Sequence, residues 1–339
     1  MYDILNKDEF AIIRILRKDI EVELLNYGAA IYGIKTRDYQ GKMEDIVLKY
    51  KNLDDYINNN IYLNATIGPI SGRIRDGIVK VLDKEYHFDL NSDGLHTLHS
   101  GKYAVTYKYF DYEITEDEDY TEVVFLYETS EPVNYLLRVF YRVYDNMIRI
   151  DYEVETDKVF VFNLTNHAYF NLSGNLKENI RNHHVSLSSN LRHEVDKYLV
   201  FTGNVIEEQD IYDFRKSKAV EDAIRVLEKT PKGGIDDIYY VPNNNLRKIV
   251  ATVYDPISKR MMKVRSSMDH IVFYSHNNIN NLPLEYLGEH KKHYALCFEC
   301  QNGPYGFNDE FAKKSLLKPR KLMKETIIFE FYNKFIQKL

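Results

Sequence analysis

Residues 163–174 read Asn-Leu-Thr-Asn-His-Ala-Tyr-Phe-Asn-Leu-Ser-Gly and follow the apolar run Val159 to Phe162. The change from apolar to hydrogen-bonding side chains predicts a strand that gives way to a polar loop, and the final Ser-Gly predicts a turn. His167 is the one side chain of this stretch that can exchange a proton near neutral pH, which makes it a candidate general acid or base. A histidine in such a place also serves as a hydrogen-bonded structural residue, and the stretch alone leaves both roles open.

A second candidate, Glu299, stands in a strand-like segment that begins at Tyr294 and stops at the turn Gly303-Pro304. A carboxylate within such a segment needs a partner or a chemical role. If Glu299 and His167 face one pocket, they form the pair of groups with different intrinsic pKa that general acid–base catalysis needs. Whether two residues so far apart in the chain meet is a question for the structure.

Length and composition allow one large globular unit. The chain has 339 residues, 44% of them hydrophobic, with 17 Phe and 29 Tyr, which is ample material for a core. We find no repeat of fixed period, no low-complexity tract and no linker rich in Pro, Gly or Ser. The sequence therefore predicts a single domain over residues 1–339.

Charge and targeting signals narrow the class of protein. The chain carries 45 basic and 51 acidic residues, a net charge of -6, and the signs are mixed along the sequence. Nucleic-acid and membrane-surface binding both rely on clustered positive charge, so we expect neither. No apolar run approaches ~18 residues, and Met1 to Phe10 does not read as a secretion signal, so we expect a cytoplasmic protein. Monomer and homodimer both stay open.

Periodicity favours an all-β protein. Short runs rich in Ile, Val, Leu and Tyr alternate with tight turns, and no crossover-length helix separates them, which disfavours a parallel sheet. The runs expected as strands include Ile12 to Ile15, Glu21 to Asn26, Ala30 to Thr36, Asp45 to Tyr50 and most of Tyr103 to Glu155. Within the last run, alternation places two sets of residues each on one face of a strand: Tyr103, Val105, Tyr107 and Tyr109, and Leu137, Val139, Tyr141 and Val143. The short helices expected are Asn52 to Ile57 and Lys216 to Lys229.

Three loops carry candidate binding residues. Arg73 lies in a loop with three glycines and a proline, where its donors suit sugar hydroxyls or an anion, although an ordinary surface arginine fits equally. His96 and His99 lie three apart without a third ligand at standard spacing, so contact with a polar ligand is the better interpretation than a metal. Asp236 and Asp237 follow a glycine pair at the start of a strand, where a turn-forming role is the ordinary alternative.

Cys297 and Cys300 form a Cys-x-x-Cys that invites a redox or zinc interpretation. No second cysteine pair completes a zinc site, and residues three apart in a strand point to opposite faces. We expect no metal and no cofactor.

Several of these segments together resemble one family, the aldose 1-epimerases or galactose mutarotases. Residues 165–172 are similar to the family signature Thr-Asn-His-x-Tyr-Phe-Asn-Leu, which is the most specific match. Other similar segments follow in the family's order over nearly the whole chain: residues 45–48, 53–56, the Arg73 loop, 98–101, 213–215, 234–236, 253–256, 273–274 and 296–301.

The resemblance implies a large antiparallel β-sandwich of the galactose mutarotase type, with a few short helices, that interconverts the α and β anomers of free hexoses. His167 would be the general acid that protonates the ring oxygen, and Glu299 the general base that takes the proton of the C1 hydroxyl. Arg73, His99 and Asp236 would hold the sugar hydroxyls, since Arg and His donate hydrogen bonds and a carboxylate accepts them.

The chain departs from the family pattern at Pro69, Ser100, Asp237 and Cys300, which flank the expected sugar-binding groups and so leave the preferred sugar open. Two alternatives are a hexose 6-phosphate mutarotase, with Arg75 on the phosphate, and a non-catalytic sugar-binding protein. A glycosidase is disfavoured because its chemistry usually needs two carboxylates.

Overall fold

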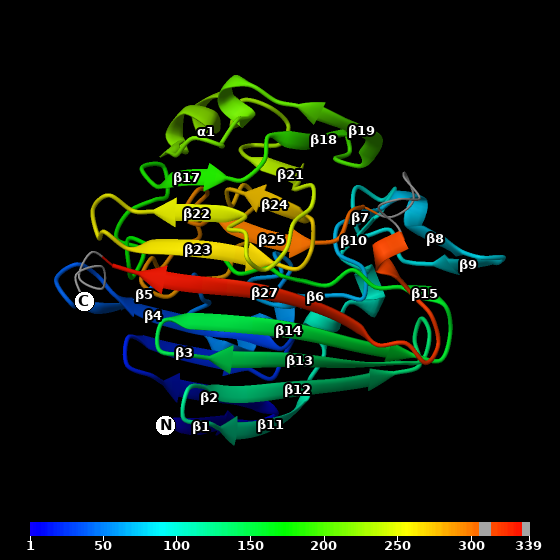
Figure 1. Cartoon of the computed structure of the whole chain (residues 1–339), viewed down its shortest axis with the longest axis horizontal. Helices are drawn as coiled ribbons and strands as arrows, with labels where there is room; N and C mark the ends of the chain where they lie inside the picture. Colours follow the sequence, from blue (N-terminus) through cyan, green and yellow to red (C-terminus); the bar gives the residue numbers. More distant parts are fainter. Residues whose placement is uncertain (305–312, 334–339) are drawn as a thin grey trace.

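The computed structural model describes residues 1–304 and 313–333, and its regular structure is almost entirely antiparallel strand. The largest sheet has nine strands and crosses the whole molecule (Figure 1). In sheet order these strands are β11 (Asp111–Glu116), β12 (Thr121–Thr129), β13 (Tyr135–Val143), β14 (Met147–Thr156), β27 (Met323–Tyr332), β23 (Met261–Ser266), β22 (Ala251–Tyr254), β17 (His184–Leu187) and β20 (Lys218–Ala219).

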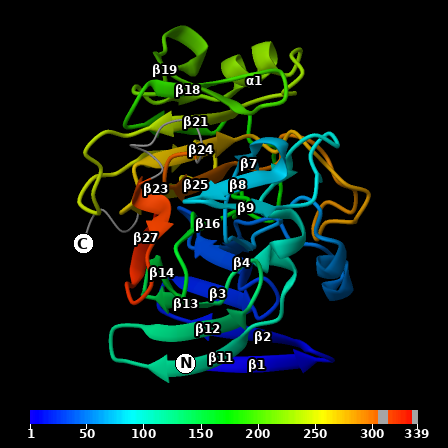
Figure 2. The same cartoon turned by 90° about the vertical axis from the view of Figure 1, so that its right-hand side faces the viewer.

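Two five-stranded sheets pack against the nine-stranded sheet, both on the same side, as the two views together show (Figures 1 and 2). One consists of β1 (Tyr2–Lys7), β2 (Phe10–Leu16), β3 (Ile20–Leu25), β4 (Ala30–Arg37) and β5 (Met43–Asp45). The other, in sheet order, consists of β19 (Phe201–Glu207), β18 (Leu191–Val195), β21 (Asp236–Tyr240), β24 (His270–Tyr274) and β25 (Cys297–Gln301).

The remaining elements are short. The two-stranded pairs are β6 (Thr66–Ile67) with β16 (Thr165–Asn166), β7 (Arg73–Ile74) with β10 (Thr97–Leu98), β8 (Ile78–Val81) with β9 (Lys84–His87), and β15 (Phe160–Val161) with β26 (Leu316–Leu317). The helical segments include α1 (Glu221–Leu227) and the 3₁₀ turns η1 (Leu53–Asn58), η2 (Arg75–Gly77), η3 (Gly101–Tyr103), η4 (Val105–Tyr107) and η5 (Asp210–Tyr212). Within the described part of the chain, no helix combines the length and apolar character needed to cross a bilayer.

The core forms where the inward faces of the sheets meet. Along β13 every second residue is buried, because successive side chains of a strand point to opposite faces. Tyr141 lies on the buried face and donates a hydrogen bond of 2.8 Å from its hydroxyl to the carbonyl oxygen of Ala29, which joins two layers. In the five-stranded sheet that contains β24 and β25, Phe273 of β24 and Phe298 of β25 stack with ring centres 5.2 Å apart. The expected all-β sandwich is therefore confirmed.

Two strand predictions are wrong in part. The strand expected from Asp45 to Tyr50 ends at Asp45. The following residues make only isolated bridges, Val47 with Phe170 and Tyr50 with Leu284, because both partners lie in irregular segments. Residues 103–107 form two 3₁₀ turns instead of a strand, since Val105 N–H bonds to Gly68 and the Thr106 hydroxyl bonds to Thr66.

A third region holds a hairpin that the sequence did not reveal. Residues 195–208 carry scattered turn signals, yet they contribute to β18 and β19. The register of this pair shifts between His193 and Val195, and such an irregularity disrupts the alternation on which strand prediction relies. The helix expected over Lys216 to Lys229 is confirmed but shorter, because β20 takes up its first residues.

Candidate active site

His167 is held by a backbone ladder between the polar stretch and the glycine-rich loop. β16 pairs with β6, and the N–H of His167 continues the ladder by donating to Ala65 O at 3.0 Å. Asn64 N–H donates to His167 O at 3.1 Å, and the Asn64 side chain accepts a hydrogen bond from Tyr169 N at 2.9 Å. Asn64 has φ of 57°, a left-handed conformation that asparagine adopts more readily than most residues. The backbone on both sides of the imidazole is therefore fixed.

Glu299 comes from the middle of β25, where it pairs with Val272 of β24. Alternation along the strand divides its residues between two faces: Glu299 and Gln301 face a cavity, whereas Phe298 and Cys300 belong to the hydrophobic core. The same alternation brings Asp236 of β21 to the cavity face, where it pairs with Tyr274.

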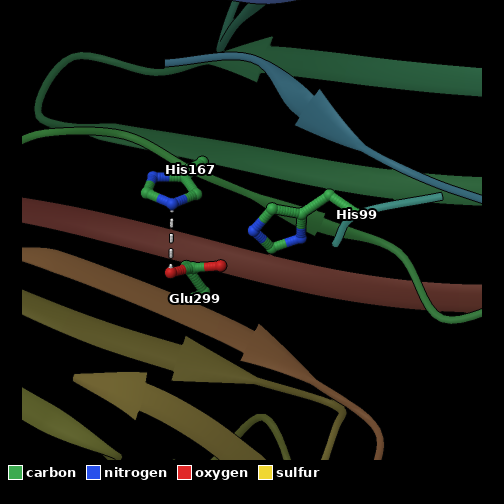
Figure 3. A group of neighbouring side chains, drawn as sticks. All are labelled: His99, His167 and Glu299. Atoms are coloured by element: carbon green, nitrogen blue, oxygen red, sulfur yellow. Dashed lines mark ion pairs between the residues drawn. The ribbon is translucent and has the colours of Figure 1, made fainter. Parts of the chain in front are cut away.

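The structure brings the two candidate proton-transfer groups together. The Nε2 atom of His167 lies 3.4 Å from Oε1 of Glu299 (Figure 3), and their residues are only 6% and 4% exposed. Both line one cavity of about 130 Å³. Arg73, His99 and Asp236 line the same cavity, so all five candidate site residues converge on it.

The tautomer of His99 follows from one hydrogen bond. The backbone N–H of Gly72 donates to Nδ1 of His99 at 3.1 Å, so in the neutral ring the proton lies on Nε2. His99 can therefore donate from Nε2 to a hydroxyl oxygen. Nε of Arg73 is buried and has no hydrogen-bond partner within the described chain, which leaves a donor for a ligand.

Burial sets the proton affinities of the pair. It raises the pKa of Glu299 to about 8, with a further rise from the charge of Asp236 and an opposing effect of Arg73. Burial also lowers the pKa of His167 to about 4. Between these values the pair holds one proton, and in the empty cavity that proton lies on the carboxyl group. Burial raises the pKa of Asp236 as well, against the attraction of Arg73.

Aromatic rings complete the surroundings of His167. Tyr169 stacks on the imidazole with ring centres 4.9 Å apart and an angle of 17° between the planes, and Tyr274 meets the imidazole edge-on at 6.1 Å. Tyr62 packs against His99 at 4.6 Å. We assigned no role in the site to these tyrosines from the sequence, although Tyr169 lies within the quoted stretch and Tyr274 within a segment that resembles the family.

Other cavity residues also escaped the sequence interpretation. Gln301 lies two positions after Glu299, and the period of a strand would have placed it on the same face. Val195, Leu199 and Phe201 also line the cavity, but nothing in their sequence sets them apart from other apolar residues.

Among residues 1–304 and 313–333, one group of side chains has the geometry to hold a metal ion, and it belongs to this cavity. Ligand atoms of His99, His167 and Glu299 lie within 4.8 Å of one another (Figure 3). Coordination needs a lone pair, however, and the bond from Gly72 N–H occupies Nδ1 of His99 while Nε2 carries the proton. His99 is therefore a poor ligand in this tautomer. His96 does not line the cavity, and its Nδ1 accepts a hydrogen bond from Asp76 N–H at 3.1 Å.

The four departures from the family pattern all lie outside the cavity lining. Ser100 donates to Ile70 O at 2.9 Å, and Asp237 faces Arg192 at 3.1 Å and Lys232. Cys300 is buried with a free thiol, as is Cys297. These substitutions therefore change the support of the site without changing its lining.

Arg75 has a structural task away from the cavity lining. Its Nη2 atom donates to Phe201 O at 3.2 Å and lies 3.6 Å from a carboxylate oxygen of Asp196. It does not line the cavity beside Arg73, where the phosphate alternative had placed it.

Fold and site together define a β-sandwich protein with a buried imidazole–carboxyl pair, which is equipped for proton transfer. The chain belongs to the aldose 1-epimerase family, because the sequence model of that family matches residues 12–330. It is an isomerase of this family, as the resemblance of residues 165–172 predicted, and its substrate is a sugar.

Individual relatives agree with this assignment. The galactose mutarotase of Mus musculus is 28% identical over 325 residues, which cover 93% of this chain and 92% of the relative. The maltose epimerase of Levilactobacillus brevis is 23% identical over 322 residues, with coverage of 93% and 92%. Among solved structures, an aldose epimerase homologue from C. elegans has a TM-score of 0.86 at 22% identity, covers 96% of this chain and 99% of its own, and shows that the fold is shared.

Proposed function

We propose that this protein interconverts the α and β anomers of a free hexose, galactose or glucose, by opening and re-closing the pyranose ring. The observation that carries the proposal is the contact of 3.4 Å between His167 and Glu299 inside a cavity that admits a small ligand. A hemiacetal carries its hydroxyl and its ring oxygen on one carbon, so two proton-transfer groups that lie close together can serve both oxygens.

In the first half of the reaction Glu299, as carboxylate, takes the proton of the C1 hydroxyl while His167, as imidazolium, gives a proton to the ring oxygen. The bond from C1 to the ring oxygen breaks and an open-chain aldehyde forms. Rotation about the bond between C1 and C2 then presents the other face of the aldehyde. In re-closure the C5 hydroxyl gives its proton back to His167 as its oxygen attacks C1, while Glu299 gives its proton to the aldehyde oxygen, and the other anomer forms.

The proton affinities of Glu299 and His167 fit this cycle, because in each half-reaction one of the two groups gains a proton from the sugar and the other gives a proton to it. Ring opening leaves Glu299 protonated and His167 neutral, which is the arrangement that burial favours in the empty cavity. Sugar hydroxyls that donate to the carboxylate, together with Arg73, favour the opposite arrangement before ring opening. Both arrangements have the same net charge, so the low-dielectric cavity never holds an excess proton.

Arg73 and His99 donate to sugar hydroxyls in this proposal, and Asp236 accepts from them. The cavity lining also favours a free sugar over a sugar phosphate. The His167–Glu299 pair with its one proton is neutral, the carboxyl group of Asp236 lies opposite the one guanidinium of Arg73, and Arg75 is engaged with Phe201 and Asp196. A phosphate dianion would therefore find too few cations in the cavity lining to pair with it.

We further propose that residues 1–339 act as one domain in the cytoplasm and need no cofactor, nucleic acid or membrane partner. The mixed distribution of charge along the chain supports this, and monomer and homodimer both fit it.

Polarimetry tests the proposal. Freshly dissolved α-D-galactose or α-D-glucose should approach its equilibrium rotation faster with the protein than without it, whereas glucose 6-phosphate should show little acceleration. A protein that binds these sugars without changing the rate would be the non-catalytic alternative.

A further inference from the structure

Tyr274 brings a phenol group to the wall of the cavity. It is the last residue of β24, it lines the cavity and it is 6% exposed. The proposed reaction gives it no role, because the proton transfers and the hydrogen bonds to sugar hydroxyls are assigned to other side chains. A tyrosine in such a place contributes an apolar ring, a polar hydroxyl or both.

The phenol of Tyr274 is held in position by its neighbours. The imidazole of His167 meets the ring at 79° with centres 6.1 Å apart, and the ring of Tyr169 meets it at 87° with centres 6.2 Å apart. The backbone N–H of Asn278, which also lines the cavity, donates a hydrogen bond of 2.8 Å to the phenol oxygen. Both the ring and the oxygen of Tyr274 are therefore fixed before a sugar binds.

The hydroxyl of Tyr274 keeps one unused donor. A tyrosine hydroxyl accepts hydrogen bonds and donates one, and the bond from Asn278 N uses it as an acceptor. In the part of the chain that the structure describes, no atom accepts the hydrogen of this hydroxyl. Since buried polar groups are normally paired, a hydroxyl at a cavity wall with a free hydrogen is suited to a ligand inside that cavity.

Asp236 supplies an acceptor beside this donor. It lies directly opposite Tyr274 in the pairing of β21 with β24, and both side chains are on the cavity face (Figure 1). Directly opposite residues on one face of a sheet have their Cβ atoms about 5 Å apart. Burial raises the pKa of the Tyr274 hydroxyl, and the charge of Asp236 raises this pKa further, so the carboxylate acts on the phenol oxygen.

We infer that Tyr274 and Asp236 bind one and the same hydroxyl group of the sugar, which accepts a hydrogen bond from the phenol and donates one to the carboxylate. A sugar hydroxyl has the donor and the acceptor capacity that these two bonds need, and two hydrogen bonds through a shared hydroxyl strengthen each other. The inference rests on the proposed function. It makes Tyr274 a specificity-determining residue, because a sugar without that hydroxyl leaves both side chains unpaired.

Deoxy sugars test the inference, because each of them lacks one hydroxyl and keeps the reactive C1. Polarimetry gives kcat/KM of wild type, Tyr274→Phe and Asp236→Asn on the faster of galactose and glucose and on its 2-, 3-, 4- and 6-deoxy forms. In Tyr274→Phe the ratio of kcat/KM between the parent sugar and one deoxy sugar should fall roughly 10-fold, the effect of one neutral hydrogen bond. In Asp236→Asn the ratio should fall for the same deoxy sugar. Any effect of Asp236 on the pKa of Glu299 cancels in this ratio.

The chain offers a matched control in Tyr239. It is a buried tyrosine of β21, but it faces the hydrophobic core, and its hydroxyl donates to Tyr212 O at 2.9 Å. Tyr239→Phe therefore removes a hydroxyl from the same sheet without changing the cavity. The ratio should stay at the wild-type value for every deoxy sugar, and circular dichroism should show that all variants are folded.

A folded Tyr274→Phe variant with unchanged ratios for all deoxy sugars would overturn the inference and leave the mutarotase proposal intact, as would ratios that fall for different deoxy sugars in the two variants. If Tyr274→Phe does not fold, deoxyfluoro sugars decide the question with the wild type. Fluorine accepts a weak hydrogen bond but donates none, so at the shared position the fluorinated sugar should react faster than the deoxy sugar and slower than the parent. Equal rates for the fluorinated and deoxy sugars at every position would contradict the inference. Failure of the wild type to accelerate either parent sugar would instead overturn the proposed function, and this inference with it.

Discussion

The buried carboxyl group of Glu299 makes a prediction about stability that is separate from activity. Glu299 is 4% exposed, and burial raises its pKa from 4.5 to about 8 in the folded protein. The folded state therefore holds this proton over a pH range in which the unfolded state has released it. The stability that the protonated Glu299 side chain contributes is complete below pH 4.5 and is lost as pH rises through 8. The difference between the two pKa values lowers the free energy of unfolding by about 5 kcal/mol at pH 9.

The substitution that exposes this effect is Glu299→Gln, which keeps the shape of the side chain but removes its ionisation. Relative to the wild type, the variant should have a similar free energy of unfolding at pH 4.5 and an advantage of about 5 kcal/mol at pH 9. Urea denaturation at several pH values, followed by circular dichroism because the chain has no Trp, measures this difference.

Glu113→Gln is the control, since Glu113 is an exposed carboxylate on the edge strand β11 and should show no comparable pH dependence. If the difference between Glu299→Gln and wild type stayed constant from pH 4.5 to 9, the carboxyl group would not have the buried, proton-retaining character that the proposed mechanism uses.

Three further predictions concern catalysis and support of the site. The profile of kcat/KM against pH should be a bell with limbs near pH 4 and pH 8. Below pH 4 His167 is protonated as well as Glu299, and above pH 8 both groups have lost their protons, so that only between these values does the pair hold the one proton that the reaction needs. A rate that rises steadily to pH 10 would contradict this. Arg73→Met should raise KM roughly 10-fold and shift the alkaline limb to higher pH, because loss of the positive charge raises the pKa of Glu299 further; polarimetry at several sugar concentrations would refute it if only kcat changed. Asn64→Ala should lower the free energy of unfolding by roughly 3 kcal/mol, since its buried side chain bonds both Leu48 O and Tyr169 N; a urea midpoint equal to that of the wild type would argue against this role.

Local sequence was sufficient for the elements whose side chains alternate regularly. The period-two pattern of Leu137, Val139, Tyr141 and Val143 predicts a strand with one buried face, and this is what β13 is. The same reasoning failed at residues 103–107, where tyrosines also alternate, because hydrogen bonds to the glycine-rich loop and β6 outweigh the local preference for a strand.

The candidate site shows a similar division. Composition marked His167 and Glu299 as unusual, but the antiparallel bridge between Phe170 and Leu296, with two backbone hydrogen bonds of 2.9 Å, is what brings their segments side by side, so that the two side chains lie 3.4 Å apart. The tautomer of His99 depends on a backbone donor 27 positions away, at Gly72. No local pattern encodes such contacts, which result from the way the sheets stack.

The hairpin that carries Leu199 is the clearest omission. Its residues are ordinary in type, and their place on the cavity wall follows from the position of β18 in the sheet and from the hold of Arg75 on the turn. One alternative drawn from the sequence, a hexose 6-phosphate mutarotase, gives Arg75 a contact with the phosphate because it lies beside Arg73 in the sequence. In the structure the two arginines serve different partners.

The most direct test of the account compares wild type, Glu299→Gln and His167→Asn by polarimetry on freshly dissolved α-D-galactose and α-D-glucose at pH 7, with sugar binding measured in parallel. The account predicts that each substitution lowers the rate on the faster sugar by ~10²-fold or more while the affinity changes much less. A folded Glu299→Gln variant that retained near-normal turnover would contradict the claim that this carboxyl group and His167 carry the protons of the reaction.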